Sequence, residues 1–327
     1  MNMEKRKVFV SRVIPQAALE ILQEHVALEL NSEDKPLTKP ELISRIQGKE
    51  GLVCLLTDEI DDEVLGSSPS LRVVSNVAVG FNNIDVGAAT RRKIAVTNTP
   101  GVLDETTADF TWALLMATAR RVVEADRYAR AGKYQGWGIM LMLGHDVYGK
   151  TLGICGMGRI GKAVARRARG FGMKILYADV QRIGEDSEKD LAIQFVDKDT
   201  LLRESDFITL HVPLLPETTH YISGRELSLM KRTAHLINAS RGPVVDEEAL
   251  VGALKTQQIA GAGLDVFEQE PEIHPGLMKL DNVVLAPHIA SASVETRTRM
   301  ATMAAGNMID ALGGKIPPHI VNPEIYK

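Results

Sequence analysis

The stretch that decides the fold runs from Lys150 to Asp179 and reads KTLGICGMGRIGKAVARRARGFGMKILYAD. Thr151–Cys155 has the apolar character of a buried strand, and three glycines spaced as G-x-G-x-x-G follow it directly. A helix is expected over 159–169 and a second strand over 173–178. This order of strand, glycine loop, helix and strand indicates the βαβ unit that binds the pyrophosphate of a dinucleotide.

Each glycine of the loop has its own physical task. Gly156 permits the tight turn, Gly158 lets the backbone approach a pyrophosphate, and Gly161 lets the helix pack against the strand. The first residues of the helix, Arg159 and Ile160, would then present free N–H groups to an anion at the positive end of the helix dipole. A glycine-rich turn that binds nothing is the alternative, but the flanking strand, the helix and the later acidic residue favour a dinucleotide site.

Asp179 ends the second strand and indicates which dinucleotide is bound. It lies 18 residues past Gly161, where a carboxylate can accept hydrogen bonds from ribose hydroxyls. The same charge repels the 2′-phosphate of NADP, so NAD is favoured as the cofactor and NADP stays possible. Arg182 could bind that phosphate, although a solvated loop charge is the simpler interpretation of this residue.

Length and charge bound the class of protein. The chain has 327 residues, enough for two domains, and a formal net charge of −4, which gives no reason to expect nucleic acid or an anionic membrane as a partner. No apolar run is long enough to span a membrane and the N-terminus does not resemble a signal peptide, so a cytoplasmic protein is expected. Cys54 and Cys155 lie in apolar stretches without metal-ligand spacing, so buried thiols and no metal site are predicted.

The first hundred residues alternate apolar strands with short helices, which predicts βαβ units and a parallel sheet. This region has no phosphate-binding loop, so its sheet should serve another ligand. Two loops follow strands in this region: 77–85, which contains Gly80, and 97–103. They could bind that ligand or be simple turns. Strands are expected at 7–14, 51–56, 71–77 and 94–96, and helices at 15–25, 41–46 and 84–92.

One long helix is expected from Asp104 to Gly132, between two domains. The loop 136–146 then contains five consecutive apolar residues, Ile139–Leu143, which we expect another subunit to cover. The last helix, 293–312, is expected to return to the first domain. Between these segments, strands are expected at 207–212, 234–239, 261–267 and 283–285, and helices at 200–204, 224–230 and 247–257.

Three ionisable side chains lie just past expected strand ends, on the edge of the sheet that carries the glycine loop. They are Arg241 in LINASRGPVVD, Glu270 in GLDVFEQEP and His288 in VVLAPHIA. Hydride transfer to a ketone needs a cation that fixes the substrate, an acid that protonates the alkoxide, and a group that orients this acid. Arg241 suits the first role because its planar fork matches the carboxylate of a 2-oxo acid, and His288 and Glu270 suit the second and third.

Each of these residues also has a structural interpretation. Arg241 could form a surface ion pair, Glu270 could be solvated, and His288 could be a core histidine. His211 competes with His288, but it ends a strand on the cofactor side, so we assign it to lining the cofactor. Taken together with the dinucleotide site, the three residues are better explained as a catalytic set.

The glycine loop, HVPLLPET at 211–218 and the three stretches quoted above together resemble the D-isomer-specific 2-hydroxyacid dehydrogenases. Their order and spacing match over nearly the whole chain. The resemblance implies an α/β fold with parallel sheets: a flavodoxin-like substrate domain (1–102 and 288–327) and an inserted Rossmann-like domain (103–287) that binds NAD(P), with a cleft between them. It also implies a homodimer.

The same resemblance implies the roles of individual residues. Arg241, Glu270 and His288 would be the catalytic set, with His288 as the proton donor. Val79 and Gly80 would bind the substrate carboxylate through their backbone, and Leu56 would be a further substrate contact. The expected contacts to the cofactor are Thr107, Gly156, Gly158, Arg159, Ile160, Gly161, Asp179, His211, Val212, Pro213, Thr218, Ala239, Ser240, Asp265 and Ala290.

Within the family, GLVCLLTD at 51–58 and GWGIMLMLG at 136–144 resemble the glyoxylate and hydroxypyruvate reductases, in which the second stretch belongs to the dimer contact. The expected activity is therefore NAD(P)H-dependent reduction of glyoxylate or hydroxypyruvate to the D-2-hydroxy acid. Reductases of this group that prefer NADPH usually carry Ser or Gly followed by Arg where Asp179 and Val180 stand here, which again favours NAD.

Other members of the family remain as alternatives. Ala286 stands where formate dehydrogenases carry Gln before the proline, so formate is not the expected substrate, and the chain has no room for the regulatory domain that phosphoglycerate dehydrogenases often add. Another D-2-hydroxyacid dehydrogenase or a phosphite dehydrogenase would fit the same catalytic set. NAD-sensing corepressors of similar sequence are a binding-module alternative, but they carry long tails, whereas this chain ends at Lys327 soon after its last helix.

Overall fold

The computed structural model describes residues 5–327, which form two compact units. The first unit contains the chain up to Leu103 together with Ala292–Lys327, and the second contains Asp104–Ser291. The expected boundaries were 102/103 and 287/288, so the second boundary falls later than expected. His288 consequently lies in the second unit, because its N–H donates to Asp265 O at 2.8 Å.

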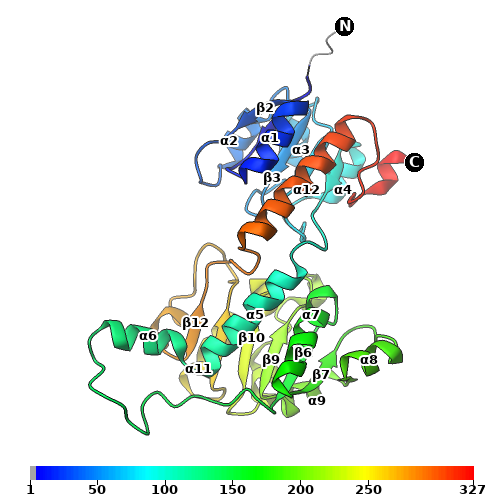
Figure 1. Ribbon diagram of the computed structural model, residues 1–327. Coiled ribbons are helices and arrows are strands. Elements are labelled where there is room, and N and C mark those ends of the chain that lie inside the picture. Colours follow the sequence, from blue (N-terminus) through cyan, green and yellow to red (C-terminus); the bar gives the residue numbers. More distant parts are fainter. Residues whose placement is uncertain (1–4) are drawn as a thin grey trace. The chain divides into compact units, whose positions relative to one another are not determined.

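The first unit is built on a five-stranded parallel sheet with the strand order β2-β1-β3-β4-β5 (Figure 1). This is the 2-1-3-4-5 order of flavodoxin-like folds, so the expectation for this unit is confirmed. Its strands are β1 (Lys7–Val10), β2 (Ala27–Leu30), β3 (Gly51–Cys54), β4 (Val73–Asn76) and β5 (Ala95–Thr97), and its helices are α1 (Gln16–His25), α2 (Lys39–Arg45), α3 (Asp62–Ser67), α4 (Val86–Arg91) and α12 (Val294–Leu312).

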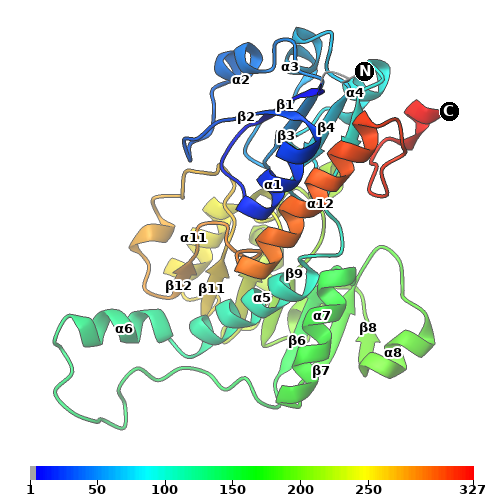
Figure 2. The same cartoon turned by 45° about the horizontal axis from the view of Figure 1, so that its top comes forward.

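Helices form two layers around this sheet because successive strand residues point to opposite faces. Phe9, Leu52 and Val74 share one core with apolar residues of α2, α3 and α4. Helices α1 and α12 lie side by side (Figures 1 and 2), and α12 also packs on β3, β4 and β5. Ser75 Oγ donates to Ala304 O at 2.9 Å and ties α12 to β4. The last helix therefore returns to the first unit, as expected.

The second unit contains a seven-stranded parallel sheet with the order β12-β11-β10-β9-β6-β7-β8. The chain reverses its direction of progress across the sheet between β6 and β9, and open α/β sheets bind ligands at such a switch point. The strands are β6 (Thr151–Cys155), β7 (Lys174–Ala178), β8 (Ile193–Phe195), β9 (Phe207–Leu210), β10 (His235–Asn238), β11 (Gly261–Leu264) and β12 (Val283–Leu285), and the helices are α5 (Asp104–Ala119), α6 (Val122–Arg130), α7 (Arg159–Ala168), α8 (Glu185–Leu191), α9 (Lys198–Glu204), α10 (Gly224–Leu229) and α11 (Glu247–Lys255).

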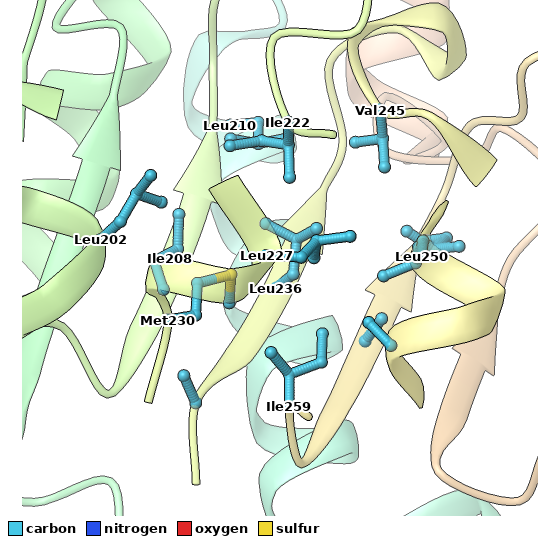
Figure 3. Packing of buried hydrophobic residues seen from close by; sticks show 14 of the residues in the cluster. Leu202, Ile208, Leu210, Ile222, Leu227, Met230, Leu236, Val245, Leu250 and Ile259 are labelled. Carbon is cyan, nitrogen blue, oxygen red and sulfur yellow. The ribbon is translucent and has the colours of Figure 1, made fainter. Parts of the chain in front are cut away.

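Helices also cover both faces of the second sheet. Helices α5 and α7 pack together on one face, where Trp112 Nε1 donates to Val164 O at 3.2 Å. An apolar core lies beneath α9, α10 and α11 on the opposite face. Figure 3 shows members of this core from the strands and helices, among them Leu202, Ile208, Leu227, Leu236 and Leu250.

The single long helix expected over 104–132 was wrong, because the chain forms α5 and α6 with a break between them. Arg121 has a φ of 54°, in the left-handed region that ends helical geometry, and its guanidinium pairs with Glu124 at 2.7 Å. No glycine or proline marks this break in the sequence. The short elements β2, α3, α8 and β8 were also not expected, and the pairing of β1, β9 and β11 ends earlier than their apolar patterns predicted.

Residues 131–150, which we call the arm, follow α6 and lead to β6 (Figures 1 and 2), and Val147 near their end is buried in the core of the second unit. Trp137 is 80% exposed, Ile139 70% and Met140 74%, although apolar side chains of this size are normally covered. Both cysteines are buried and free, as expected. In residues 5–327 no helix is long and apolar enough to cross a membrane.

Candidate active site

The glycine loop joins β6 to α7 at the switch point of the second sheet. Gly156 has a φ of 93°, and a Cβ atom there would lie 2.7 Å from the carbonyl of His211, which follows β9. A Cβ atom at Gly161 would lie 2.2 Å from Gly156 O, so the third glycine permits the helix to pack on the loop. A Cβ atom at Gly158 would meet nothing within 4 Å, so this position borders open space.

The N-terminus of α7 suits an anion. Gly158 is the N-cap, and no side chain of the described residues caps the helix. The first N–H groups of the helix, among them those of Arg159 and Ile160, have no intrahelical acceptors. These N–H groups lie at the positive end of the helix dipole, and together with the dipole they favour a bound phosphate. The loop and the helix therefore fit the pyrophosphate of a dinucleotide.

Asp179 ties the end of β7 to this loop. One carboxylate oxygen accepts the N–H of Met157 at 2.6 Å, and the other accepts the N–H of Gln181 at 3.3 Å. The carboxylate thus lies beside the loop, where the ribose hydroxyls of a dinucleotide are expected. Arg182 lies in the loop after Asp179 with its side chain 52% exposed, and its guanidinium binds both carboxylate oxygens of Glu188, at 2.8 and 2.7 Å.

The other predicted cofactor contacts lie past the carboxyl ends of β9, β10, β11 and β12, except Thr107, which is buried in α5. Thr218 Oγ1 donates to Pro213 O at 2.6 Å and accepts the N–H of Leu215 at 2.8 Å, which folds the loop after β9. The contact of each residue with a dinucleotide stays a prediction. The residues on this edge are His211, Val212, Pro213, Thr218, Ala239, Ser240, Asp265 and Ala290.

The structure separates the two histidines that competed for the acid role. Burial lowers the pKa of His211 to about 4, and its Nε2 has no hydrogen-bond partner among the described residues. A histidine with this pKa is neutral near pH 7 and does not serve as a proton donor there. His288 has a carboxylate partner instead, because its Nδ1 lies 2.8 Å from Glu270 Oε2.

The turn after β10 carries Arg241 and is built by Asn238. Asn238 Oδ1 accepts hydrogen bonds from the backbone N–H and the hydroxyl of Ser240, at 3.0 and 2.7 Å, and Asn238 Nδ2 donates to Arg241 O at 3.0 Å. Arg241 Nη1 donates to Ser240 O at 2.7 Å. Burial lowers the pKa of Arg241 and the charge of Glu270 opposes this effect, but an arginine remains charged in either case.

Glu270 and His288 form a hydrogen-bonded pair. Glu270 Oε2 lies 2.8 Å from His288 Nδ1, and Glu270 Oε1 accepts the N–H of Phe267 at 3.0 Å. Burial raises the pKa of Glu270, but the hydrogen bonds from His288 and the Phe267 N–H, together with the charges of His288 and Arg241, outweigh burial, so this pKa lies below its usual value. The ionised carboxylate holds Nδ1, and Nε2 is the nitrogen left to act on a substrate.

His288 occupies an unusual backbone conformation, with a φ of 54°. The carboxylate of Asp265, which is fully buried, accepts the N–H groups of Ile289 and Ala290 at 2.7 and 2.8 Å. Asp265 therefore fastens the segment after β12 to the end of β11 and supports the strained residue. This is a structural task for a side chain that the sequence predicted as a cofactor contact.

The segments that carry Arg241 and Glu270 also touch. A Cβ atom at Gly242 would lie 1.7 Å from Phe267 O, so only glycine permits this approach. Arg241, Glu270 and His288 accordingly come from three neighbouring strand ends of the second unit, as the sequence predicted.

Two supporting residues were missed by the sequence reasoning. Asn238 could have been noticed as an amide that ends an apolar strand. His220 could not, because its partner is distant in sequence: His220 Nε2 lies 2.7 Å from Glu268 Oε1, and this bond raises the pKa of His220. The Glu268 N–H donates to Glu247 Oε1 at 2.8 Å, so both contacts brace the segment that leads to Glu270.

The predicted substrate contacts Leu56, Val79 and Gly80 belong to the first unit. They lie in loops after β3 and β4, and the Val79 and Gly80 carbonyls accept hydrogen bonds from Asn98 Nδ2 and Asn76 Nδ2, at 2.8 and 2.9 Å. Their contact with a substrate stays a prediction. Within residues 5–327 no group of three or more His, Cys, Asp and Glu side chains could hold a metal ion.

Comparisons with known proteins agree with this geometry. Residues 112–290 match the family model described as the D-isomer specific 2-hydroxyacid dehydrogenase, NAD binding domain. A glyoxylate reductase from Korarchaeum cryptofilum is 60% identical over 99% of this chain and 98% of its own, and one from Thermococcus gammatolerans is 51% identical with the same coverage. The crystal structure of an NADPH-dependent glyoxylate/hydroxypyruvate reductase from Sinorhizobium meliloti, in complex with NADP and malonate, superposes with a TM-score of 0.87 at 32% identity, covering 97% of each chain.

The chain belongs to the D-isomer-specific 2-hydroxyacid dehydrogenase family. It is an NAD(P)-dependent oxidoreductase, and within the family it is similar to the glyoxylate reductases.

Proposed function

We propose that this protein reduces a small 2-oxo acid, glyoxylate or hydroxypyruvate, to the D-2-hydroxy acid, with NADH as the preferred coenzyme. The proposal is carried by the 2.8 Å hydrogen bond between His288 Nδ1 and Glu270 Oε2, in a unit that also holds Arg241 and the glycine loop. The names of the relatives described above support a small 2-oxo acid as the substrate.

Each residue of the catalytic set has one role in this reaction. Arg241 binds the substrate carboxylate through paired N–H groups and so orients the neighbouring carbonyl. A nicotinamide coenzyme, when bound, would supply the hydride for the carbonyl carbon. His288 Nε2 gives its proton to the carbonyl oxygen, so that the product leaves as an alcohol. Glu270 orients His288 by holding Nδ1, which leaves Nε2 to face the substrate.

The preference for NADH is proposed from Asp179. A dinucleotide on the glycine loop would bring its adenosine ribose to the end of β7, where this carboxylate lies. Ribose hydroxyls can donate to a carboxylate, whereas a 2′-phosphate would be repelled by it.

The proposed function is tested with a panel of 2-oxo acids, including glyoxylate, hydroxypyruvate and pyruvate, each assayed with NADH and with NADPH. We expect glyoxylate or hydroxypyruvate with NADH to give the highest kcat/KM. Oxidation of phosphite with NAD, without reduction of any 2-oxo acid, would replace the proposed substrate class. Binding of NADH without turnover of any compound would indicate a coenzyme-sensing module instead of an enzyme.

We also propose that the protein is a homodimer in which the arm contacts a second subunit. Contiguous exposed apolar side chains mark a contact site. The arm has five consecutive apolar residues in its middle, Ile139–Leu143, and several of them are exposed. We expect sedimentation equilibrium to give twice the chain mass of 35.7 kDa. The double variant Ile139→Asp and Met140→Asp should sediment as a monomer, whereas the control Val180→Asp, at an exposed residue outside the arm, should not. A monomeric parent protein would contradict this proposal.

A further inference from the structure

A cluster at the end of β7 contains the side chains of Tyr177, Arg182 and Glu188. This is the end of the strand where the 2′-phosphate of NADP is expected. Arg182 Nε and Nη2 donate to the two carboxylate oxygens of Glu188 at 2.8 and 2.7 Å. Tyr177 OH donates to Glu188 Oε1 at 2.5 Å and accepts the N–H of Ile183 at 3.1 Å. The cluster therefore joins β7, the loop after Asp179 and helix α8 in one network.

We propose that Glu188 is a specificity-determining residue that withholds Arg182 from the 2′-phosphate of NADP. This inference rests on the coenzyme preference in the proposed function and deepens it. Arg182 is the cation that lies three residues after Asp179, and an arginine near this position is what accommodates a 2′-phosphate in dinucleotide-binding folds. In the structure one edge of its guanidinium, Nε with Nη2, is bound to both oxygens of a carboxylate of the chain itself.

The geometry makes Glu188 a strong competitor for this guanidinium. Bidentate, charge-assisted hydrogen bonds of this kind are among the strongest between side chains. The Glu188 side chain is only 10% exposed, whereas that of Arg182 is 52% exposed. The Arg182 and Tyr177 hydrogen bonds lower the pKa of Glu188 to about 2, so the carboxylate stays charged at any pH where the enzyme would be assayed.

A phosphate that recruited Arg182 would leave Glu188 without its cation. The abandoned carboxylate would lie next to the phosphate, and Asp179 would add a second negative charge beside it. Tyr177 is fully buried, so it would hold Glu188 in place and the carboxylate would not follow Arg182 into solvent. Asp179 repels the phosphate directly, and Glu188 acts by engaging Arg182.

The test compares variants with the parent protein. For each protein the dissociation constants of NADH and NADPH are measured by coenzyme fluorescence, and kcat/KM for glyoxylate is measured alongside. Glu188→Gln keeps the size of the side chain and an acceptor for Tyr177, but it removes the charge that holds Arg182. We expect about tenfold or greater tightening of NADPH binding in this variant, which is the effect of one released charge-assisted contact, while NADH binding stays within twofold. Arg182→Ala added to Glu188→Gln should abolish the gain.

A second comparison does not depend on the folding of the Glu188 variant. Arg182→Ala alone should not tighten NADPH binding, because the guanidinium is already bound to Glu188 and its removal leaves the charge of that carboxylate without its cation. A tighter NADPH affinity in Arg182→Ala, or an unchanged NADPH-to-NADH affinity ratio in a folded Glu188→Gln variant, would overturn the inference. Asp179→Ala should tighten NADPH binding both in the parent protein and in the Glu188→Gln variant, since it removes the direct repulsion between this carboxylate and the 2′-phosphate.

Binding and turnover separate this inference from the proposed function. If no 2-oxo acid is reduced but the coenzyme affinities shift as described, the proposed function fails and the role of Glu188 stands. If 2-oxo acids are reduced with equal affinity for NADH and NADPH in the parent protein, the role of Glu188 fails and the reductase assignment stands.

Discussion

Replacing His288 by Asn is expected to lower kcat for 2-oxo acid reduction by about 10²- to 10⁴-fold, which is the usual contribution of a general acid. Asn keeps a polar side chain of similar reach but carries no proton that it can give to an alkoxide. The dissociation constant of NADH should change little, because the glycine loop and the N-terminus of α7 are separate from the His288 segment. Stopped-flow and steady-state assays at saturating glyoxylate provide the measurement.

Two further variants make the His288 result specific. His25→Asn changes an exposed histidine of the first unit and should keep parental turnover. Glu270→Gln keeps a hydrogen-bond partner for His288 Nδ1 but replaces a charge-assisted bond with a weaker neutral one, so kcat for reduction should fall while the dissociation constant of NADH stays close to the parental value. Parental kcat in His288→Asn would refute the acid role of His288, and parental kcat in Glu270→Gln would refute the orienting role of Glu270.

The sequence predicted those parts of the fold that are encoded by local pattern. Thr151–Cys155, the three glycines and the helix that follows were predicted within a residue or two of their observed limits, because strand, turn and helix signals coincide there. The edge strand β8 has only three residues, and a pattern of that length carries no period. The break at Arg121 depends on a left-handed residue without glycine, which no local rule indicates.

The candidate site shows the same division. The carboxyl ends of parallel strands share one edge of a sheet, so topology alone predicted that Arg241, Glu270 and His288 would gather there. What topology does not specify is which side chains hold those three in place. The contacts of Asn238 with the Arg241 turn and of Asp265 with the His288 segment depend on loop conformations that form only when neighbouring strand ends pack. Glu188 was missed for this reason as well, since a helix brings it to Arg182.

Arg241→Lys is expected to lower kcat/KM for glyoxylate by about 10²-fold or more, because a lysine ammonium is a point charge and cannot bind a carboxylate through two parallel N–H bonds. The turn built by Asn238 holds the backbone of residue 241 in either variant, so the loss should come from the side chain. NADH affinity and thermal stability should stay close to parental values, and the loss should appear in KM as well as kcat because the carboxylate is bound before and during the reaction.

The matched control for this variant is Arg232→Lys, which makes the same exchange at an exposed position and should have no effect. Removal of the side chain gives an independent check. The Arg241→Ala variant should regain part of its activity when free guanidinium ion is added at millimolar concentration. Rescue of this kind requires a guanidinium at the reacting centre, and a merely structural arginine would not show it. If Arg241→Lys retained parental kcat/KM for glyoxylate, the substrate carboxylate would have to be bound by another group, and the choice of a 2-oxo acid as substrate would lose its main support from the residues of this chain.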